Sequence, residues 1–388
     1  MRLSRRFVLS TAVLASIAVT TVAASLLPDN EITVGVSGYS DSFGVDVLYP
    51  SVTATKRISE HGAVSGRYLV DAVTSASMKS RFEVDGITSA TRTAHGGGSG
   101  RLDEVRQEFG VGGSRLFGRT LGSVDALHST EHDYVSTTLA ATVARTLQRE
   151  NLEVRLGLVR SWDEVSPVTR TWTRPKDVTS LDLSLTQTLH RRGTGQLDFT
   201  HTAMSGQLAD VYQIVPIVEV ENQQVHLLEP RHPGHRSRNA LGTQTSWKVA
   251  SNTSIELGYR RYWDSWGIES DTVHGRLRQR IFRRNVILGF GLRGYWQGRA
   301  EFFRETYDGS ERYLTVDSKL DSGHSTEYQF QSVLAGSLVR GFGVLDPDRT
   351  EIDVHVDLYE RTTRTPDWHR RREQMRAVLG SISIRYRY

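Results

Sequence analysis

Titratable side chains alternate along Asp353-Val354-His355-Val356-Asp357, so three of them share one face if this segment is a strand. About 7 Å would separate neighbours on that face, a spacing that suits a charge ladder or a cation site. A metal site needs further convergent ligands, and nothing local supplies one. His201, His274 and His324 join His355 as candidate general bases of a hydrolase. We favour a hydrogen-bonded network of acids and bases over either chemistry.

Two other patterns suggest chemistry. His95-Gly96-Gly97-Gly98 looks like a lipase oxyanion-hole motif, but no Gly-x-Ser-x-Gly nucleophile motif accompanies it and no cysteine is present. Asp41, Asp46, Asp71 and Asp264 are candidate Ca²⁺ ligands, and pairing with arginine is the alternative that we favour. We therefore predict no catalytic residue, no metal and no cofactor, and a protein that is not an enzyme.

The first 24 of the 388 residues have the pattern of a cleaved export signal. Arg2, Arg5 and Arg6 precede an apolar stretch and the small residues Val22-Ala23-Ala24. Removing this segment takes the formal net charge from +4 to +1, so a nucleic-acid partner is not indicated. No later stretch is long and apolar enough to predict a transmembrane helix. We expect one domain over residues 25–388.

Polar and apolar residues alternate with period two through most of this domain. Val286, Leu288, Phe290, Leu292 and Trp296 share one face of the clearest segment. Because such alternation over 10 to 14 residues is typical of membrane β-barrels, we predict an all-β fold, an antiparallel up-and-down transmembrane barrel of about 16 strands, or 14 if one weak pair within 32–57 does not close the wall.

The strand positions predict two different rims. We expect strands to begin near residues 32, 46, 63, 103, 117, 134, 151, 178, 194, 239, 252, 269, 284, 325, 350 and 375. Every long connection follows an odd-numbered strand on this assignment: 75–100, 164–177, 206–238, 299–324 and 362–374. The pattern predicts short periplasmic turns and long extracellular loops.

The polar face of the strands would line the lumen. Of the 48 basic residues only five are lysine, so arginine dominates. The residues that we expect to face the lumen carry both signs of charge: Glu153, Arg155, Asp182, Asp198, Glu256, Arg293, Asp353, His355, Asp357, Arg385 and Arg387. Such a wall can favour either sign of ion, or it can close a narrow lumen through arginine–carboxylate bridges.

Aromatic residues lie toward the long-loop ends of the strands and predict an interfacial girdle, with a sugar-binding row as the alternative: Trp162, Trp172, Tyr259, Trp263, Trp266, Tyr295 and Trp296. The last strand is amphipathic and ends at Tyr388, which resembles the signal that the bacterial barrel-insertion machinery reads. The expected partners are that machinery and outer-membrane lipid. A small lipoprotein or further copies of the chain are additional candidates.

Three stretches resemble a family of bacterial outer-membrane barrels of unknown function, number 3570. They are residues 68–77, Asp103-Glu104-Val105-Arg106 leading to Gly112-Gly113-Ser114, and residues 262–268, read Tyr-Trp-Asp-Ser-Trp-Gly-Ile. The resemblance covers essentially the whole mature chain and implies a barrel in the outer membrane. It implies no substrate.

These observations predict a porin-like channel or transporter for small polar solutes, located in the bacterial outer membrane. The first alternative is a non-conducting barrel that sheathes a small lipoprotein or redox partner. The second alternative is an outer-membrane hydrolase. We expect loops 206–238 and 299–324 to gate the channel. Loop 206–238 is long enough to fold inward as a constriction, or it can project outward and contact a partner.

Overall fold

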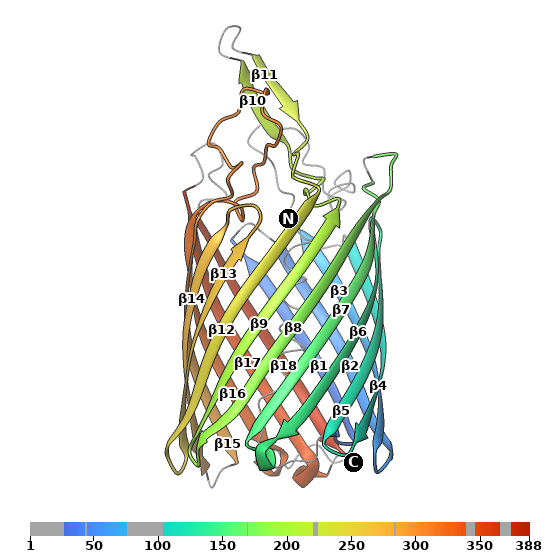
Figure 1. The fold of residues 1–388 in the computed structure, drawn as a ribbon, viewed down its shortest axis with the longest axis vertical. Coiled ribbons are helices and arrows are strands. Elements are labelled where there is room, and N and C mark those ends of the chain that lie inside the picture. The colour runs from blue at the N-terminus through green and yellow to red at the C-terminus, as the bar shows by residue number, and fades with distance from the viewer. Residues whose placement is uncertain are drawn as a thin grey trace.

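Sixteen antiparallel strands close into one barrel (Figure 1). The structure, a computed structural model, describes residues 27–42, 45–75, 104–168, 170–219, 224–282, 285–338, 346–364 and 374–388. The predicted signal peptide and His95 lie outside these residues. In these ranges, no helix is long and apolar enough to cross a membrane.

The barrel strands are mostly 11 to 17 residues long. Their bounds are β1 Glu31–Asp41, β2 Val45–Ser59, β3 Gly62–Ser75, β4 Glu104–Phe117, β5 Thr120–Glu131, β6 Tyr134–Leu147, β7 Leu152–Val165, β8 Arg174–His190, β9 Gly193–Gly206, β12 His235–Ala250, β13 Thr253–Asp264, β14 Glu269–Ile281, β15 Val286–Gln297, β16 Gly323–Ala335, β17 Thr350–Thr363 and β18 Gln374–Arg387. All sixteen predicted starts fall within four residues of these. The predicted fold class and the count of sixteen are confirmed.

The first and last strands close the wall. β1 pairs with β18 in an antiparallel register that sets Val34 opposite Ile384. At the rim the Tyr388 N–H donates to the carbonyl oxygen of Asn30 over 3.1 Å. The C-terminal strand therefore completes the barrel, and none of the sixteen described barrel strands is left with an unpaired edge.

The two rims differ as predicted, with one exception. Tight turns join β2 to β3, β8 to β9 and β12 to β13 at one rim, and long connections leave the other rim after β3, β9 and β15. The prediction that every long connection follows an odd-numbered strand is wrong for residues 336–349, which join β16 to β17 at the short-turn rim. This segment contains two short 3₁₀ helices, Gly336–Leu338 and Pro347–Arg349, whose turn-forming sequence carries no strand alternation.

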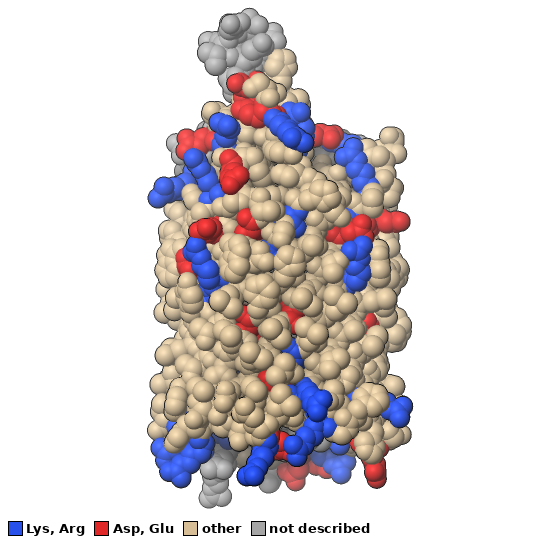
Figure 2. All heavy atoms as spheres, in the orientation of Figure 1, with Lys and Arg blue, Asp and Glu red and all other residues tan. Residues whose placement is uncertain are grey.

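Side-chain exposure follows the predicted alternation. Phe290, Leu292 and Trp296 are each more than half exposed, whereas residues between them face the other side of the wall. On the visible face, charged atoms gather toward the two ends and the middle is mainly uncharged (Figure 2). An apolar belt of this kind contacts lipid, and the alternate residues face the lumen.

The long connection between β9 and β12 contains a hairpin that the sequence did not predict. Its strands, β10 Val215–Glu219 and β11 Gln224–Leu228, pair with each other only and project beyond the barrel end (Figure 1). The hairpin thus follows the projecting alternative, not the inward constriction.

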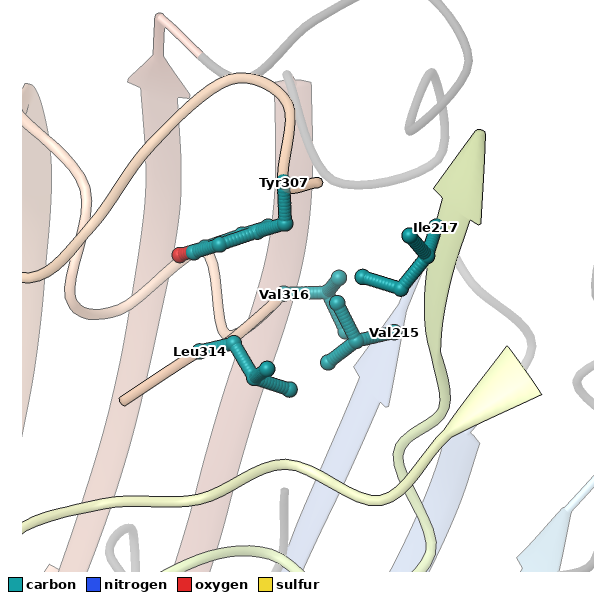
Figure 3. Packing of buried hydrophobic residues seen from close by; sticks show 5 residues of the cluster. All are labelled: Val215, Ile217, Tyr307, Leu314 and Val316. Carbon is teal, nitrogen blue, oxygen red and sulfur yellow. The ribbon is translucent and has the colours of Figure 1, made fainter. Parts of the chain in front are cut away.

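The hairpin packs on the connection between β15 and β16. Val215 and Ile217 point toward Leu314 and Val316, and the ring of Tyr307 lies over this contact (Figure 3). Arg231 and Leu314 exchange two backbone hydrogen bonds of 2.9 and 3.0 Å. These connections form an ordered cap, the segments 207–217, 225–234 and 298–322, at the long-loop end.

Candidate functional site

Each of the eleven residues that we expected to face the lumen occupies a strand position that alternates with the exposed apolar residues of its strand. Arg293, for example, lies between Leu292 and Gly294 on β15 and is set opposite His274 of β14. The arrangement follows from the period of a strand, in which successive side chains point to opposite faces.

All four arginines among these residues form ion pairs with neighbours on the same wall. Arg293 Nη1 lies 3.1 Å from Glu327 Oε2, and Arg385 Nη1 lies 2.9 Å from Glu351 Oε1. Arg155 pairs with Glu153 at 3.3 Å on β7. Arg387 lies 4.0 Å from Glu31 at the short-turn rim.

Three of the six acidic members accept from uncharged donors. Asp182 accepts from the Thr200 hydroxyl at 2.7 Å, and Asp198 from the Gln196 amide at 2.8 Å. Asp353 accepts from the Gln331 amide at 2.8 Å. These bonds orient the carboxylates without neutralising their charge, so the inner wall keeps discrete charges.

The Asp353-His355-Asp357 row is a network of side-chain pairs. His355 Nε2 lies 2.9 Å from Asp357 Oδ1, whereas Asp353 bonds to Gln331 instead. Among the residues that the structure describes, no group of three or more His, Asp and Glu side chains is arranged to hold a metal ion.

The other candidate histidines are divided between the two faces. His201 shares the outer face with Leu197 and bonds to Asn239 Oδ1 at 2.8 Å, and His324 lies on the outer-face register of β16. His274 faces the lumen with its Nε2 3.8 Å from Glu256 Oε1. Within the described ranges, no serine hydroxyl is hydrogen-bonded to any of these imidazoles.

Water reaches the inner charged side chains. The side chains of Arg293, His355 and Arg385 are 35%, 34% and 40% exposed. A sixteen-strand wall is wide enough to leave an aqueous lumen between such groups. These charged side chains are therefore not sealed from solvent.

A second polar cluster at the loop ends of β6, β7 and β8 is closed to water. Asp163 accepts from the hydroxyl groups of Tyr134 and Ser136, and Lys176 Nζ lies 3.5 Å from Asp163 Oδ2. The Asp163 side chain has no exposed surface and that of Lys176 only 5%. This cluster joins strands and cannot contact a solute.

The Tyr262–Ile268 stretch of the family-like motif builds the turn between β13 and β14. Asp264 Oδ1 accepts the backbone N–H groups of Trp266 and Ile268 at 2.9 and 3.0 Å. Its Oδ2 accepts from Arg236 Nε at 2.9 Å and from the Tyr262 hydroxyl at 2.6 Å. Both carboxylate oxygens of Asp264 already accept two hydrogen bonds each, so Asp264 pairs with arginine and is not a Ca²⁺ ligand. The side chain of Asp71 lies outside the described part of the structure.

Only part of the predicted aromatic girdle exists. Trp162, Tyr259, Trp263 and Trp296 are exposed on the outer face near the long-loop end. The prediction is wrong for Trp266, whose ring is buried against the cap. The Arg236 guanidinium carbon lies 4.2 Å from the centroid of this ring. Tyr295 faces the lumen side and bonds to Gln297, and Trp172 packs in a loop cluster. Strand alternation explains Tyr295, which has the opposite parity to Trp296.

The cap contains one perturbed imidazole. Both ring nitrogens of His232 are buried, and its ring meets those of Trp266 and Phe302 at centroid distances of 5.3 and 5.5 Å. Burial lowers the pKa of His232 to about 4, although Asp317 acts in the opposite direction. The cap therefore holds this residue neutral at neutral pH.

The most basic part of the inner wall was not predicted from the sequence. His274, Arg276, Arg278 and Arg280 alternate with Leu277 and Gln279 on β14, so all four face the lumen. Basic residues at every second position of this segment predict such a row. Of the four, only His274 was singled out in the sequence, as a candidate general base. Arg260 of β13 faces the lumen beside them, whereas Arg261 lies on the outer face, 2.7 Å from Asp271.

The closed barrel, its apolar outer belt and its charged inner wall define an outer-membrane β-barrel of bacteria. The fold is similar to that of a bacterial polysaccharide outer membrane secretin, with a TM-score of 0.52, 6% identity, and coverage of 93% of this chain and 100% of the other. Weaker likenesses are to OccK1 (OpdK) of Pseudomonas aeruginosa (TM-score 0.44, 8% identity, 92% and 97% covered) and to OmpT of Vibrio cholerae (0.44, 8%, 94% and 100%).

The particular family follows from the sequence. The model described as "Protein of unknown function (DUF3570)" matches residues 169–382, and the chain belongs to this family. No curated protein matches the sequence. The family that the short motifs suggested is thereby confirmed, and residues 262–268 lie within the matched region.

Proposed function

We propose that the mature chain, residues 25–388, is a porin-like channel or transporter that carries small polar solutes across the outer membrane. The observation that supports this most is the water-exposed charge on the inner wall, exemplified by Arg293, His355 and Arg385. A barrel that serves only as a wall has no need of solvated charges on its inner face. Sixteen strands supply the width that passage requires.

The cap supports a controlled entrance. Its clusters are made by loops that start on well-separated strands, β9 and β15, and Leu314 and Val215 at their contact are fully buried. An ordered cap over the long-loop end would limit the size of solute that enters. The secretin-like fold is compatible with a conduit, since both are closed outer-membrane barrels.

Liposome swelling tests this proposal directly. Proteoliposomes made with the folded chain should swell in isotonic glycerol and in small amino acids, and swelling should slow as the solute becomes larger. Liposomes that contain the same protein after heat unfolding serve as the control. Equal swelling in both preparations, with the folded state verified, would reject transport. A small subunit that co-purifies with such an impermeable barrel would instead support the sheath alternative.

A further inference from the structure

The basic groups of the inner wall are concentrated on three adjacent strands. β14 contributes His274, Arg276, Arg278 and Arg280, β13 contributes Arg260, and β15 contributes Arg293. We call these six residues the basic ladder. Successive members on β14 are about 7 Å apart. Arg260 of β13 lies opposite Thr272 of β14, so the ladder from Arg260 to Arg280 extends about 26 Å along the strand direction. Because barrel strands tilt by about 40° from the barrel axis, the ladder covers roughly 20 Å along that axis, about two thirds of the thickness of the membrane core.

The ladder arginines are mostly not neutralised. Arg293 has a carboxylate partner, Glu327, whereas Arg276 donates to the amide oxygen of Gln329 at 2.9 Å. Among the described residues, no carboxylate lies within 4 Å of Arg260, Arg278 or Arg280. Elsewhere on the inner wall Arg67, Arg155 and Arg385 each have a carboxylate partner.

Neighbouring acids are held by other groups. Asp353 accepts from Gln331, Asp182 accepts from Thr200, and Asp357 Oδ1 lies 2.9 Å from His355 Nε2, so none of these acids is bonded to the ladder. Glu256 on β13 has His274 of the β14 row as its partner, at 3.8 Å. On the described inner faces of β13 to β16 the acids are Glu256, Asp264 and Glu327, fewer than the five ladder arginines, and Asp264 at the end of β13 pairs with Arg236.

The position of Arg276 is set by a glycine. Gln329 of β16 reaches across β15 at Gly291, where an added Cβ would lie 2.6 Å from the Gln329 amide oxygen. The missing side chain therefore lets Gln329 hold the guanidinium group of Arg276 without adding charge. A neutral partner orients this group and leaves it able to bind an anion.

The opposite wall is of a different kind. β4 is eight strands from β14 in either direction around the barrel. The inner face of β6 is mostly small or hydroxyl-bearing, for example Ala140 and Thr142. The inner faces of β4 and β5 combine small residues such as Gly112 and Ser123 with the Arg106–Glu108 ion pair and Asp125. A solute in the lumen would therefore meet a row of cationic groups on the β14 side and no such row on the β4 side.

We propose that the basic ladder is an anion track, along which small solutes bearing carboxylate or phosphate groups pass from one guanidinium to the next. This inference rests on the proposed function, since it names the class of solute. Guanidinium groups bind both kinds of oxyanion through paired hydrogen bonds. The spacing provides several moderate sites in series, which favours entry and still permits release.

The test is the reversal potential in planar bilayers under a tenfold KCl gradient. We expect the wild-type channel to prefer chloride. In R276Q/R278Q/R280Q the chloride-to-potassium permeability ratio should fall about fivefold, because three positive charges near the path are removed. R119Q/R191Q/R192Q, with the same charge change at exposed turn residues, is the matched control and should shift far less. If the triple variant does not fold, the single variant R278Q, which removes no ion pair, replaces it, and its permeability ratio should fall in the same direction.

A second readout uses the anions themselves. Millimolar succinate or inorganic phosphate should reduce the chloride current of the wild type, and should do so weakly in the ladder variant, while glycerol has no such effect. Block by both probes identifies the shared oxyanion chemistry, and block by one alone identifies carboxylate or phosphate. Cation preference of the open wild-type channel, or an unchanged reversal potential in folded, conducting ladder variants, would overturn the track. Absence of any current from folded wild type would overturn the proposed channel, and the track with it.

Discussion

Replacing Asp264 should open the turn between β13 and β14. This carboxylate is bonded by Arg236, by the Tyr262 hydroxyl and by the backbone N–H groups of Trp266 and Ile268. Its side chain has no exposed surface, and that of Arg236 is only 9% exposed. In Asp264→Ala both backbone groups lose their acceptor and the Arg236 guanidinium stays buried beside Trp266.

The cost follows from this burial. Removing one partner of a buried ion pair costs about 3–5 kcal/mol, chiefly because the other charge remains out of water. That amount increases the population of the opened turn roughly 100- to 4000-fold. Asp264→Asn should cost less, because its amide oxygen can still accept from the two backbone N–H groups.

Limited trypsin digestion of the folded protein measures the opening. Arg304 and Arg312 are exposed in the adjoining cap, and cleavage there follows the population of the opened form when reclosing is fast. We expect Asp264→Ala to be cleaved much faster than Asp264→Asn, and both faster than wild type. Asp308→Ala is the control, since that exposed carboxylate accepts only from Ser310. Wild-type cleavage rates in Asp264→Ala would refute the reasoning.

Three further predictions concern the cap and its supports. Leu314→Ala should cost about 2–5 kcal/mol of local stability because Leu314 is fully buried, and faster proteolysis of the β10–β11 hairpin would reveal this, with the 42%-exposed Leu227→Ala as control. The cap should loosen as pH falls from 6.5 toward 4, because His232 takes up a proton in the opened cap, whereas its pKa of about 4 keeps it neutral in the closed cap. A rate of proteolytic cleavage of the wild-type cap that does not change with pH would count against this. So would an unchanged dependence of that rate on pH in His232→Phe. Gly206→Ala should fold poorly, since φ is +97° and the new Cβ would lie 2.1 Å from the carbonyl oxygen of Pro175; normal heat-modifiable gel migration with an unchanged unfolding temperature would contradict this.

The barrel was predictable because its signal is local and repeated. Alternation such as that of Val286–Gln297 assigns each residue to a face without knowledge of its neighbours. The even strand number and the two kinds of rim followed from counting segments. The connection 336–349 broke the rule, since its length is not coupled to any alternation in the adjoining strands.

The contacts within the site were less accessible. Strand alternation alone predicts that Arg293 and Asp353 face the lumen. Their partners, Glu327 and Gln331, depend on the register between β15, β16 and β17, which a single sequence does not specify. The hairpin β10–β11 was hidden in a loop punctuated by proline. Its packing on Leu314 joins segments separated by nearly a hundred residues, and no local pattern reports such a contact.

The current through single folded molecules in a planar bilayer tests the central claim most directly. An open sixteen-strand lumen with solvated inner charges predicts stable, stepwise openings whose size grows with salt concentration. Silent bilayers at every salt concentration, with protein shown by heat-modifiable migration to be folded and inserted, would contradict a conducting lumen.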